Sequence, residues 1–385
     1  MGRLAEELNA DEKRFGSGWI SGTLSVVLGT IGLSTVLCLL YPQLLTVADI
    51  RQYYDVGLIR AALHLLLIAA FALGAVSASL RESKVLSFTG MVLVLIAALL
   101  GGSNASPRLE GSTDVYFGLD FFLLNLILLG VIFVPIERLF QLREQSVFRD
   151  EWREDLFYFF VSSLFVQSLT YLSLTPSMVV LQSTQWASDF RSAISSQPVA
   201  LQFVEIMFFT DFVQYWFHRA FHEIPWLWRF HAVHHSARHM DWIAGSRMHF
   251  FEIVLLRGFT TLPMYILGFA ETALYGYIFF VYLHSVLVHA NLKFRFGFLQ
   301  HLLVTPRYHH WHHGIEKEAI NINYAVHFPI LDRLFGTCHF PDEQWPVGYG
   351  IKDHPVPLGY WRQFLYPFRS KKATEEPAIE TDGDS

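Results

Sequence analysis

Cysteine and charge are both scarce in this chain of 385 residues, and each scarcity excludes a class of protein. The only two cysteines are Cys38, in an apolar run, and Cys338, so we expect neither a disulfide framework nor a thiolate metal site. Charged residues make up 16% of the chain, whereas a soluble protein carries about a quarter. The net charge of −6 offers no general attraction for nucleic acid, which we exclude as a partner.

Long apolar runs are present instead. Hydrophobic residues make up 52% of the sequence, and several runs approach the roughly 20 residues that cross a bilayer as a helix. These runs predict six membrane spans, at about 19–41, 59–80, 85–101, 116–136, 155–175 and 199–217, with the fifth bounded by Asp155 and Pro176. An apolar hairpin is expected over 253–270 and 271–290, broken near Gly268 and Glu271. The mixed-charge start of the chain is not a cleavable signal peptide.

Basic residues give these spans an orientation. They precede the first span, join the second to the third and follow the fourth, at Arg3, Lys13, Arg14, Arg81, Lys84, Arg138, Arg143, Arg149 and Arg153. The positive-inside tendency therefore places the N-terminus in the cytoplasm. Six crossings then bring residue 218 to the cytoplasmic face, and the hairpin returns residue 289 to the same side.

Histidines are concentrated in the last part of the chain, where 17 of the 18 follow residue 217. Eight of them form three groups at helical spacing, namely His218 and His222, then His231, His234 and His235, then His309, His312 and His313. Side chains three or four residues apart share one face of a helix, so the members of each group can point at one spot. Such grouping predicts a metal site rather than packed or surface histidines.

The number of ligands narrows the choice of metal site. Eight imidazoles exceed the four ligands of a structural zinc, but they suit two six-coordinate irons with positions left open. A zinc hydrolase motif is absent, because Trp226 stands where a second histidine would follow His222-Glu223. The Glu-x-x-His pairs of carboxylate-bridged bundles are absent as well. What remains is a histidine-rich metal pair at the membrane surface.

Four stretches carry a family resemblance, which covers about residues 199–340. DFVQYWFHRAFH (211–222), HAVHHS (231–236), TPRYHHWHHG (305–314) and NINY with LDRLFGT (321–324 and 331–337) resemble the fatty acid hydroxylase superfamily, which includes the sterol desaturases. The resemblance implies O2-dependent hydroxylation or desaturation of a lipid at a non-haem di-iron centre. Tyr308 departs from the pattern, since relatives often carry histidine there, while His310 is an additional histidine.

The resemblance also implies a set of site residues. The metal ligands would be His218, His222, His231, His234, His235, His309, His312 and His313, with His289 in HANLKF as a ninth. Asp211, Asn291, Asn323 and Asp332 are candidates for holding those ligands from behind, and Asp211 could accept a histidine N–H because it shares a helix face with His218. For His249 and Glu252, a ligand role, a supporting role and a surface pair all stay open.

Cofactors and partners follow from the same chemistry. Oxidising an unactivated C–H bond requires a redox metal, here two Fe ions, together with O2. The chain shows no haem-binding or flavin fingerprint, so electrons are expected from a separate ferredoxin, cytochrome or reductase. The substrate would be a membrane lipid, of fatty acyl, sterol or related type, that enters from the bilayer. Hydroxylation and desaturation both remain open.

The fold expected is all-α, a multi-span membrane helical bundle with a cytoplasmic helical cap that holds a histidine-rich di-metal site. Its parts would be a cytoplasmic segment (1–18), an N-terminal transmembrane module of about four spans (19–150), the catalytic domain (151–345) and a C-terminal segment with a disordered acidic tail (346–385). A bacterial inner membrane is favoured over endoplasmic reticulum. The alternative function is a histidine-rich metal-binding or transport protein without oxygenase activity, whose ligands should lie near the bilayer midplane.

Overall fold

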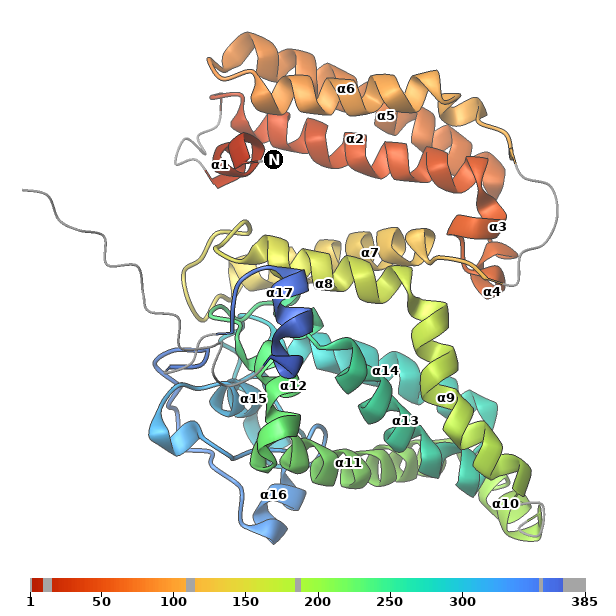
Figure 1. Ribbon diagram of the computed structural model, residues 1–385, viewed down its shortest axis with the longest axis vertical. Coiled ribbons are helices and arrows are strands. Elements are labelled where there is room, and N and C mark those ends of the chain that lie inside the picture. The colour runs from red at the N-terminus through yellow and green to blue at the C-terminus, as the bar shows by residue number, and fades with distance from the viewer. Residues whose placement is uncertain (1, 10–15, 109–114, 184–187, 353–355, 370–385) are drawn as a thin grey trace, which may run out of the picture. The chain divides into compact units, whose positions relative to one another are not determined.

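A computed structural model describes residues 2–9, 16–108, 115–183, 188–352 and 356–369 (Figure 1). Every regular element within these ranges is a helix, which confirms the all-α prediction. The chain divides into two compact units, and each is described by itself. The first comprises residues 1–138, 144–150 and 159–171, and the second comprises residues 139–143, 151–158 and 172–385. The predicted disordered tail falls largely on 370–385, outside the described residues.

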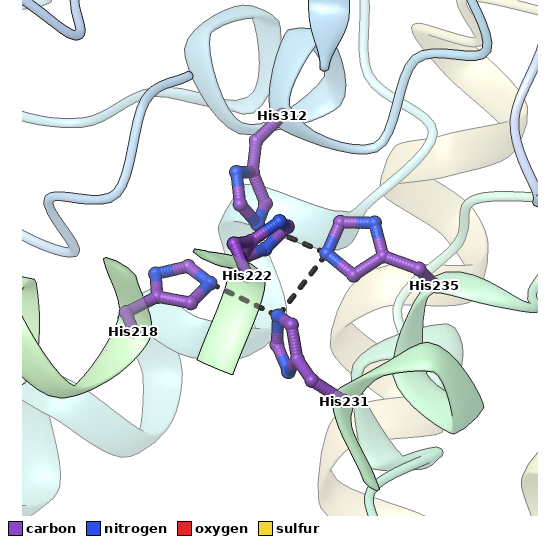
Figure 2. Close-up of side chains that lie close together, drawn as sticks. All are labelled: His218, His222, His231, His235 and His312. Carbon is purple, nitrogen blue, oxygen red and sulfur yellow. Dashed lines mark hydrogen bonds between the residues drawn. The ribbon is translucent and has the colours of Figure 1, made fainter. Parts of the chain in front are cut away.

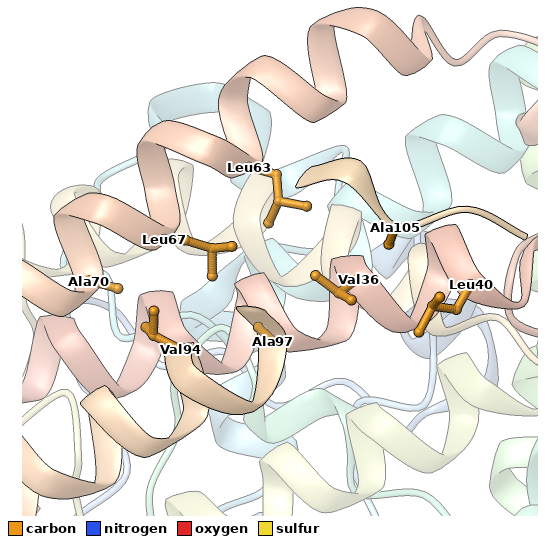
Figure 3. Close-up of a cluster of buried hydrophobic side chains, with 8 residues drawn as sticks. All are labelled: Val36, Leu40, Leu63, Leu67, Ala70, Val94, Ala97 and Ala105. Carbon is orange, nitrogen blue, oxygen red and sulfur yellow. The ribbon is translucent and has the colours of Figure 1, made fainter. Parts of the chain in front are cut away.

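The first unit is built around three long helices, α2 (Trp19–Leu40), α5 (Val56–Leu80) and α6 (Val85–Leu99), which pack against one another. Figure 3 shows the apolar cluster between them, formed by Val36, Leu40, Leu63, Leu67, Ala70, Val94, Ala97 and Ala105. The shorter helices are α1 (Gly2–Asn9), α3 (Pro42–Leu45), α4 (Ala48–Arg51) and η1 (Gly102–Asn104), and α7 (Leu119–Leu139) completes the apolar helices of this part of the chain.

Small residues allow these helices to approach closely. A Cβ atom at Gly90 of α6 would lie 2.1 Å from the Ser25 hydroxyl of α2, so only glycine fits there. The same hydroxyl donates a hydrogen bond to the Ala70 carbonyl of α5 at 2.7 Å. Small residues at contacts and hydroxyls that bond across helices are typical of association within a membrane. The packing of α2, α5 and α6 is therefore of the kind found between membrane helices.

The second unit places three helices side by side, α11 (Val199–Glu223), α13 (Phe250–Leu267) and α14 (Glu271–His289), where α11 contacts both of the others (Figure 1). Gly268, at φ 78°, ends α13 and turns the chain toward α14, as the hairpin prediction required. The histidine-bearing elements α12 (Pro225–His235) and α15 (Pro306–His312) contact α11 and α14 respectively. The remaining elements are α10 (Ser188–Ser195), η3 (Ala244–Ser246), η4 (Gly297–His301), η5 (Lys317–Ala319), α16 (Pro329–Phe335), α17 (Tyr360–Leu365) and η6 (Tyr366–Phe368).

Within the ranges that the structure describes, six helices are long and apolar enough to cross a membrane, namely α2, α5, the segment Val85–Asn104, α7, α13 and α14. They confirm a multi-pass membrane protein and match the first four predicted spans and the hairpin. The predicted sixth span, 199–217, is different. It belongs to α11, a 25-residue helix that is not among the six, because buried polar residues such as Gln202 and Asp211 interrupt its apolar sequence.

The predicted fifth span is also different from expectation. Residues 155–175 fall on two helices, α8 (Trp152–Leu164) and α9 (Val166–Ser183), whose apolar parts meet at an angle of 65°. Pro176 does not end the helix as predicted, since α9 continues through it to Ser183. A helix tolerates an internal proline when its other turns remain hydrogen-bonded, with a local distortion as the cost. This bent pair forms either one broken span or a re-entrant loop, so the described residues before His218 hold four or five candidate spans and not the six predicted.

Candidate di-metal site

Helix ends in the second unit bring nine histidines together. His218 and His222 lie near the end of α11, His289 is the last residue of α14, and the others belong to α12 and to α15 with its C-terminal cap. They form two clusters in which the potential ligand atoms lie within 4.8 Å of one another. We call them the five-histidine group (His218, His222, His231, His235 and His312) and the four-histidine group (His234, His289, His309 and His313).

Histidines of one sequence motif belong to different groups in the structure. Figure 2 shows the rings of the five-histidine group pointing toward one another from α11, α12 and α15. His231 and His235, four residues apart, share one face of α12, whereas His234 is turned by about 100° from its neighbour His235 and joins the other group. The expectation that His231, His234 and His235 point at one spot is therefore wrong, because consecutive helical residues diverge.

Ring nitrogens within each group lie close together. In the five-histidine group the Nε2 atom of His231 is 3.1 Å from those of His218 and His235, and the Nε2 atoms of His235 and His312 are also 3.1 Å apart. In the four-histidine group the Nε2 separations are 3.3 Å between His234 and His289 and 3.0 Å between His289 and His309. Each group thus presents converging nitrogen atoms.

The far side of several rings shows which nitrogen carries the proton. His234 donates its Nδ1–H to the Arg247 carbonyl at 3.0 Å, and His289 donates its Nδ1–H to the Ser285 carbonyl at 2.7 Å. A neutral imidazole has one N–H, so both Nε2 atoms are acceptors. Two acceptors 3.3 Å apart repel each other, but a shared cation about 2.1 Å from each nitrogen makes the arrangement favourable. The donor set therefore fits a metal ion.

Burial keeps these rings neutral. It lowers the pKa of His218 to about 4 and lowers the pKa of the other site histidines from α12, α15 and the end of α11 well below the ordinary value, with the neighbouring imidazoles adding to the shift. A metal ligand must offer an unprotonated nitrogen. The site is consequently ready to bind a cation at neutral pH without first losing protons.

Two rings of the five-histidine group are held by one segment, residues 322–328, which we call the 322–328 strap. The carbonyl of Tyr324 accepts the Nδ1–H of His218, and the carbonyl of Ile322 accepts the Nδ1–H of His312, both at 2.8 Å. Asn323, between them, adopts φ 55° and bonds through its side chain to main-chain atoms of Tyr308 and His339. The strap thus fixes the orientation of two rings at once.

Two buried carboxylates hold the strap. Asp332 accepts the backbone N–H groups of Tyr324 and Ala325, both at 2.8 Å. Asp211 accepts the next three backbone N–H groups, those of residues 326–328, at 2.7–3.1 Å. The side chain of Asp211 therefore accepts from the strap. The prediction that it accepts a histidine N–H is wrong. Asp211 and Asp332 therefore act on the orientation of His218 and His312 through the backbone of the strap.

Other predicted residues take defined places. Tyr308, which departs from the family resemblance, donates its hydroxyl to Asp332 at 2.9 Å and so joins the support of the strap. His310 bonds to the Tyr349 hydroxyl at 2.8 Å and belongs to neither group. Asn291 exchanges hydrogen bonds with the backbone of Arg143. His249 is buried, caps the start of α13 and donates to the Phe364 carbonyl, so it is not a surface residue.

Three features of the site could not be assigned from sequence. The fully buried Glu252 carboxyl bonds to Nδ1 of His231. Arg247, whose carbonyl orients His234, is anchored by ion pairs with Glu151 and Asp155. A separate buried pair, His284 and His327, has its Nδ1 atoms 3.3 Å apart. In the sequence, Glu252 could be noticed as a carboxylate on the helix that follows the histidine motif of α12. His284 lies at no helical spacing from a histidine motif, so the sequence does not mark it.

Comparison with known proteins adds an independent observation. Residues 203–337 match the fatty acid hydroxylase family. An ornithine lipid hydroxylase of Rhizobium tropici is 31% identical over 246 residues, which cover 63% of this chain and 72% of that protein. Alkylglycerol monooxygenases of Xenopus tropicalis and Homo sapiens are each 33% identical, over 38% of this chain but only 32% of their own length. No solved structure matches the chain.

Proposed function

The chain belongs to the fatty acid hydroxylase family, and on that premise we propose that it is a membrane-bound, O2-dependent oxygenase that hydroxylates or desaturates a C–H bond of a lipid. The observation that carries this proposal is the pair of adjacent histidine groups, whose nitrogens converge while main-chain carbonyls hold the outer face of several rings. The names of the relatives, an ornithine lipid hydroxylase and alkylglycerol monooxygenases, support a polar lipid as substrate.

Each histidine group would hold one iron. The ligands of the first are those of the five-histidine group, and the ligands of the second are those of the four-histidine group, with His289 included as predicted. Bound iron supplies what no side chain can, the reductive activation of O2 for attack on an unactivated C–H bond. Positions that histidines leave open on the ions would admit oxygen.

The protein's own residues prepare the site. Burial excludes water and keeps the imidazoles unprotonated, so their nitrogens are available at neutral pH. Carbonyls of the 322–328 strap and of Arg247 and Ser285 hold the rings in one orientation. Such support from behind preserves ligand geometry while the substrate binds. Electrons would come from an external ferredoxin, cytochrome or reductase.

We place this chemistry in a catalytic domain over residues 151–345, behind an N-terminal membrane module over 19–150. Three basic residues accompany the histidines, Arg219, Arg229 and Arg238. Their presence supports a cytoplasmic position for the site, because basic residues favour the cytoplasmic side of a membrane. The similarity to a bacterial protein supports a bacterial inner membrane. A metal transporter would carry its ligands at the midplane of spans, whereas these stand at helix ends, which favours the oxygenase.

Product analysis with labelled oxygen tests the proposal. The full chain would be expressed in a bacterium that makes ornithine lipids and grown under ¹⁸O2, with a His235→Ala variant in parallel. Hydroxylation predicts a membrane lipid that gains one ¹⁸O atom, and desaturation predicts a lipid that loses two hydrogens without gaining label. Either product must be absent from the variant. Unchanged lipids in cells that contain the iron-loaded wild type and a competent reductase would overturn the proposal for this lipid class.

A further inference from the structure

The two histidine groups differ in what stands behind their rings. Five rings have an assigned partner at Nδ1, and in four of them the partner is a main-chain carbonyl. These pairs are His218 with Tyr324, His312 with Ile322, His234 with Arg247, and His289 with Ser285. The exception is His231, whose Nδ1 contacts the Glu252 carboxyl at 2.5 Å. His231 belongs to the five-histidine group, so the carboxyl group supports only one of the two positions.

A carboxyl group affects a ligand differently from a carbonyl. Both fix the tautomer and orientation of the ring, but a carboxylate also raises the basicity of the imidazole and brings negative charge toward the ion. We propose that Glu252 is a positioning residue that makes the two metal positions unequal by strengthening metal binding in the five-histidine group, whereas His234 and His289 of the four-histidine group rest on main-chain carbonyls. The inference rests on the proposed di-metal function.

Glu252 is built into a rigid place. It lies in the first turn of α13, fully buried, and His249 caps that turn by accepting the Phe251 N–H. His249 is itself held by the Phe364 carbonyl at 2.9 Å. A buried carboxyl group is costly without a hydrogen-bonding partner, and the His231 ring provides one. The cap and the partner together fix the side chain in line with the ring.

The four-histidine group can be perturbed by a substitution that matches the one at Glu252. His289 lies directly against Gly245, where an added Cβ would stand 2.7 Å from Nδ1 of the ring. A Gly245→Ala substitution therefore pushes one ligand of the four-histidine group without altering Glu252 or His231. Glu252→Gln does the reverse, because it removes the carboxylate behind His231 while keeping an oxygen that can accept Nδ1–H. The pair of variants addresses the two positions separately.

The experiment is reconstitution of the purified full chain with ⁵⁷Fe(II) under anaerobic conditions, followed by metal analysis, Mössbauer spectroscopy and competition with a chelator. Wild type should bind two ions that give two distinct signals. Glu252→Gln should lower the affinity for iron at one position by about 10- to 100-fold. The Mössbauer signal that this variant loses first to the chelator should be the signal that Gly245→Ala retains. Glu252→Asp, which keeps the carboxylate, should restore part of the affinity. Glu205→Gln, a similar change on α11, should leave both signals unchanged.

The outcomes separate this inference from the proposed function. Two bound ions with identical signals, or equal weakening of both by Glu252→Gln, would overturn the role of Glu252 while leaving the di-metal site intact. Binding of fewer than two ions by wild type would overturn the proposed function itself and this inference with it. A Glu252→Gln protein that loses its fold is distinguished by circular dichroism, and Glu252→Asp then decides whether the carboxylate acts on one position.

Discussion

The α2–α5–α6 bundle and the histidine-bearing end of the second unit are both closely packed, but different groups hold them together. In the bundle, buried leucine, valine and alanine side chains fill the space between helices, and Gly90 admits the Ser25 hydroxyl. Around the histidines, buried carboxylates, an arginine and main-chain carbonyls connect α8, α11, α12 and α16 to the loops. The first kind of packing supports stability alone, whereas the second also fixes the direction of ligand atoms.

The largest effect should come from a ligand histidine compared with its neighbour. His309→Ala removes a ring of the four-histidine group, and we expect lipid oxidation to fall by at least about 100-fold, the upper range for residues that merely support a ligand. His310→Gln should retain activity, because the amide can still bond to the Tyr349 hydroxyl. Product formation measured by mass spectrometry, with iron content alongside, checks both. Equal loss in the two variants would contradict the division of TPRYHHWHHG into ligand and support.

Asp332→Asn should have the next largest effect. The amide keeps the size of the side chain but replaces one of the two acceptor oxygens by an N–H donor group. Either the Tyr324 N–H or the Ala325 N–H then loses its acceptor, so the 322–328 strap should shift. Because the strap holds His218 and His312, we expect iron in the five-histidine group to bind about 10- to 100-fold more weakly. Chelator competition measures the change. Unaltered affinity would show that the strap does not position these rings.

Gly90→Leu tests the packing of the α2–α5–α6 bundle instead of the histidine site. A leucine side chain cannot fit against Ser25, so α2 and α6 must separate, and overpacking of this kind costs about 1–3 kcal/mol. Thermal unfolding in detergent should occur at lower temperature, while the iron content of the folded protein stays at the wild-type value. Loss of iron at full retention of fold would show that the bundle does more than support stability.

The smallest expected effect is that of Ser25→Ala. It removes the hydrogen bond from the Ser25 hydroxyl to the Ala70 carbonyl, and such bonds between membrane helices average about 0.6 kcal/mol. A slightly lower unfolding temperature with unchanged iron content and activity is expected. The comparison with Gly90→Leu then ranks shape above hydrogen bonding in this bundle, and the reverse ranking would contradict the packing described here.

Local spacing accounts for what could be predicted from the sequence. His218 and His222, four residues apart, lie on one face of α11, and the apolar runs gave the helices of the first unit and the α13–α14 hairpin. Spacing within a motif depends only on helix geometry. For that reason the ligand-rich motifs and the all-α class were accessible before any tertiary structure was known.

Features that depend on tertiary packing were not accessible. Whether His234 joins His289 or His235 is decided by which helices meet α12, and the contact between Glu252 and His231 spans two helices. The direction of the Asp211 side chain was misjudged, because a shared helix face with His218 does not reveal that the backbone N–H groups of 326–328 lie closer. The bend between α8 and α9 likewise has no proline or glycine at its break to mark it in the sequence.

The most direct test of the central claim compares two adjacent residues, His234 and His235, which the structure assigns to different groups. Metal content per chain and Mössbauer spectra would be measured after anaerobic loading with ⁵⁷Fe(II), for wild type, His234→Ala and His235→Ala. We predict about two irons in wild type and about one in each variant, with a different signal retained in each. A single zinc that neither substitution affects would contradict a di-iron site and favour a structural or hydrolytic metal centre.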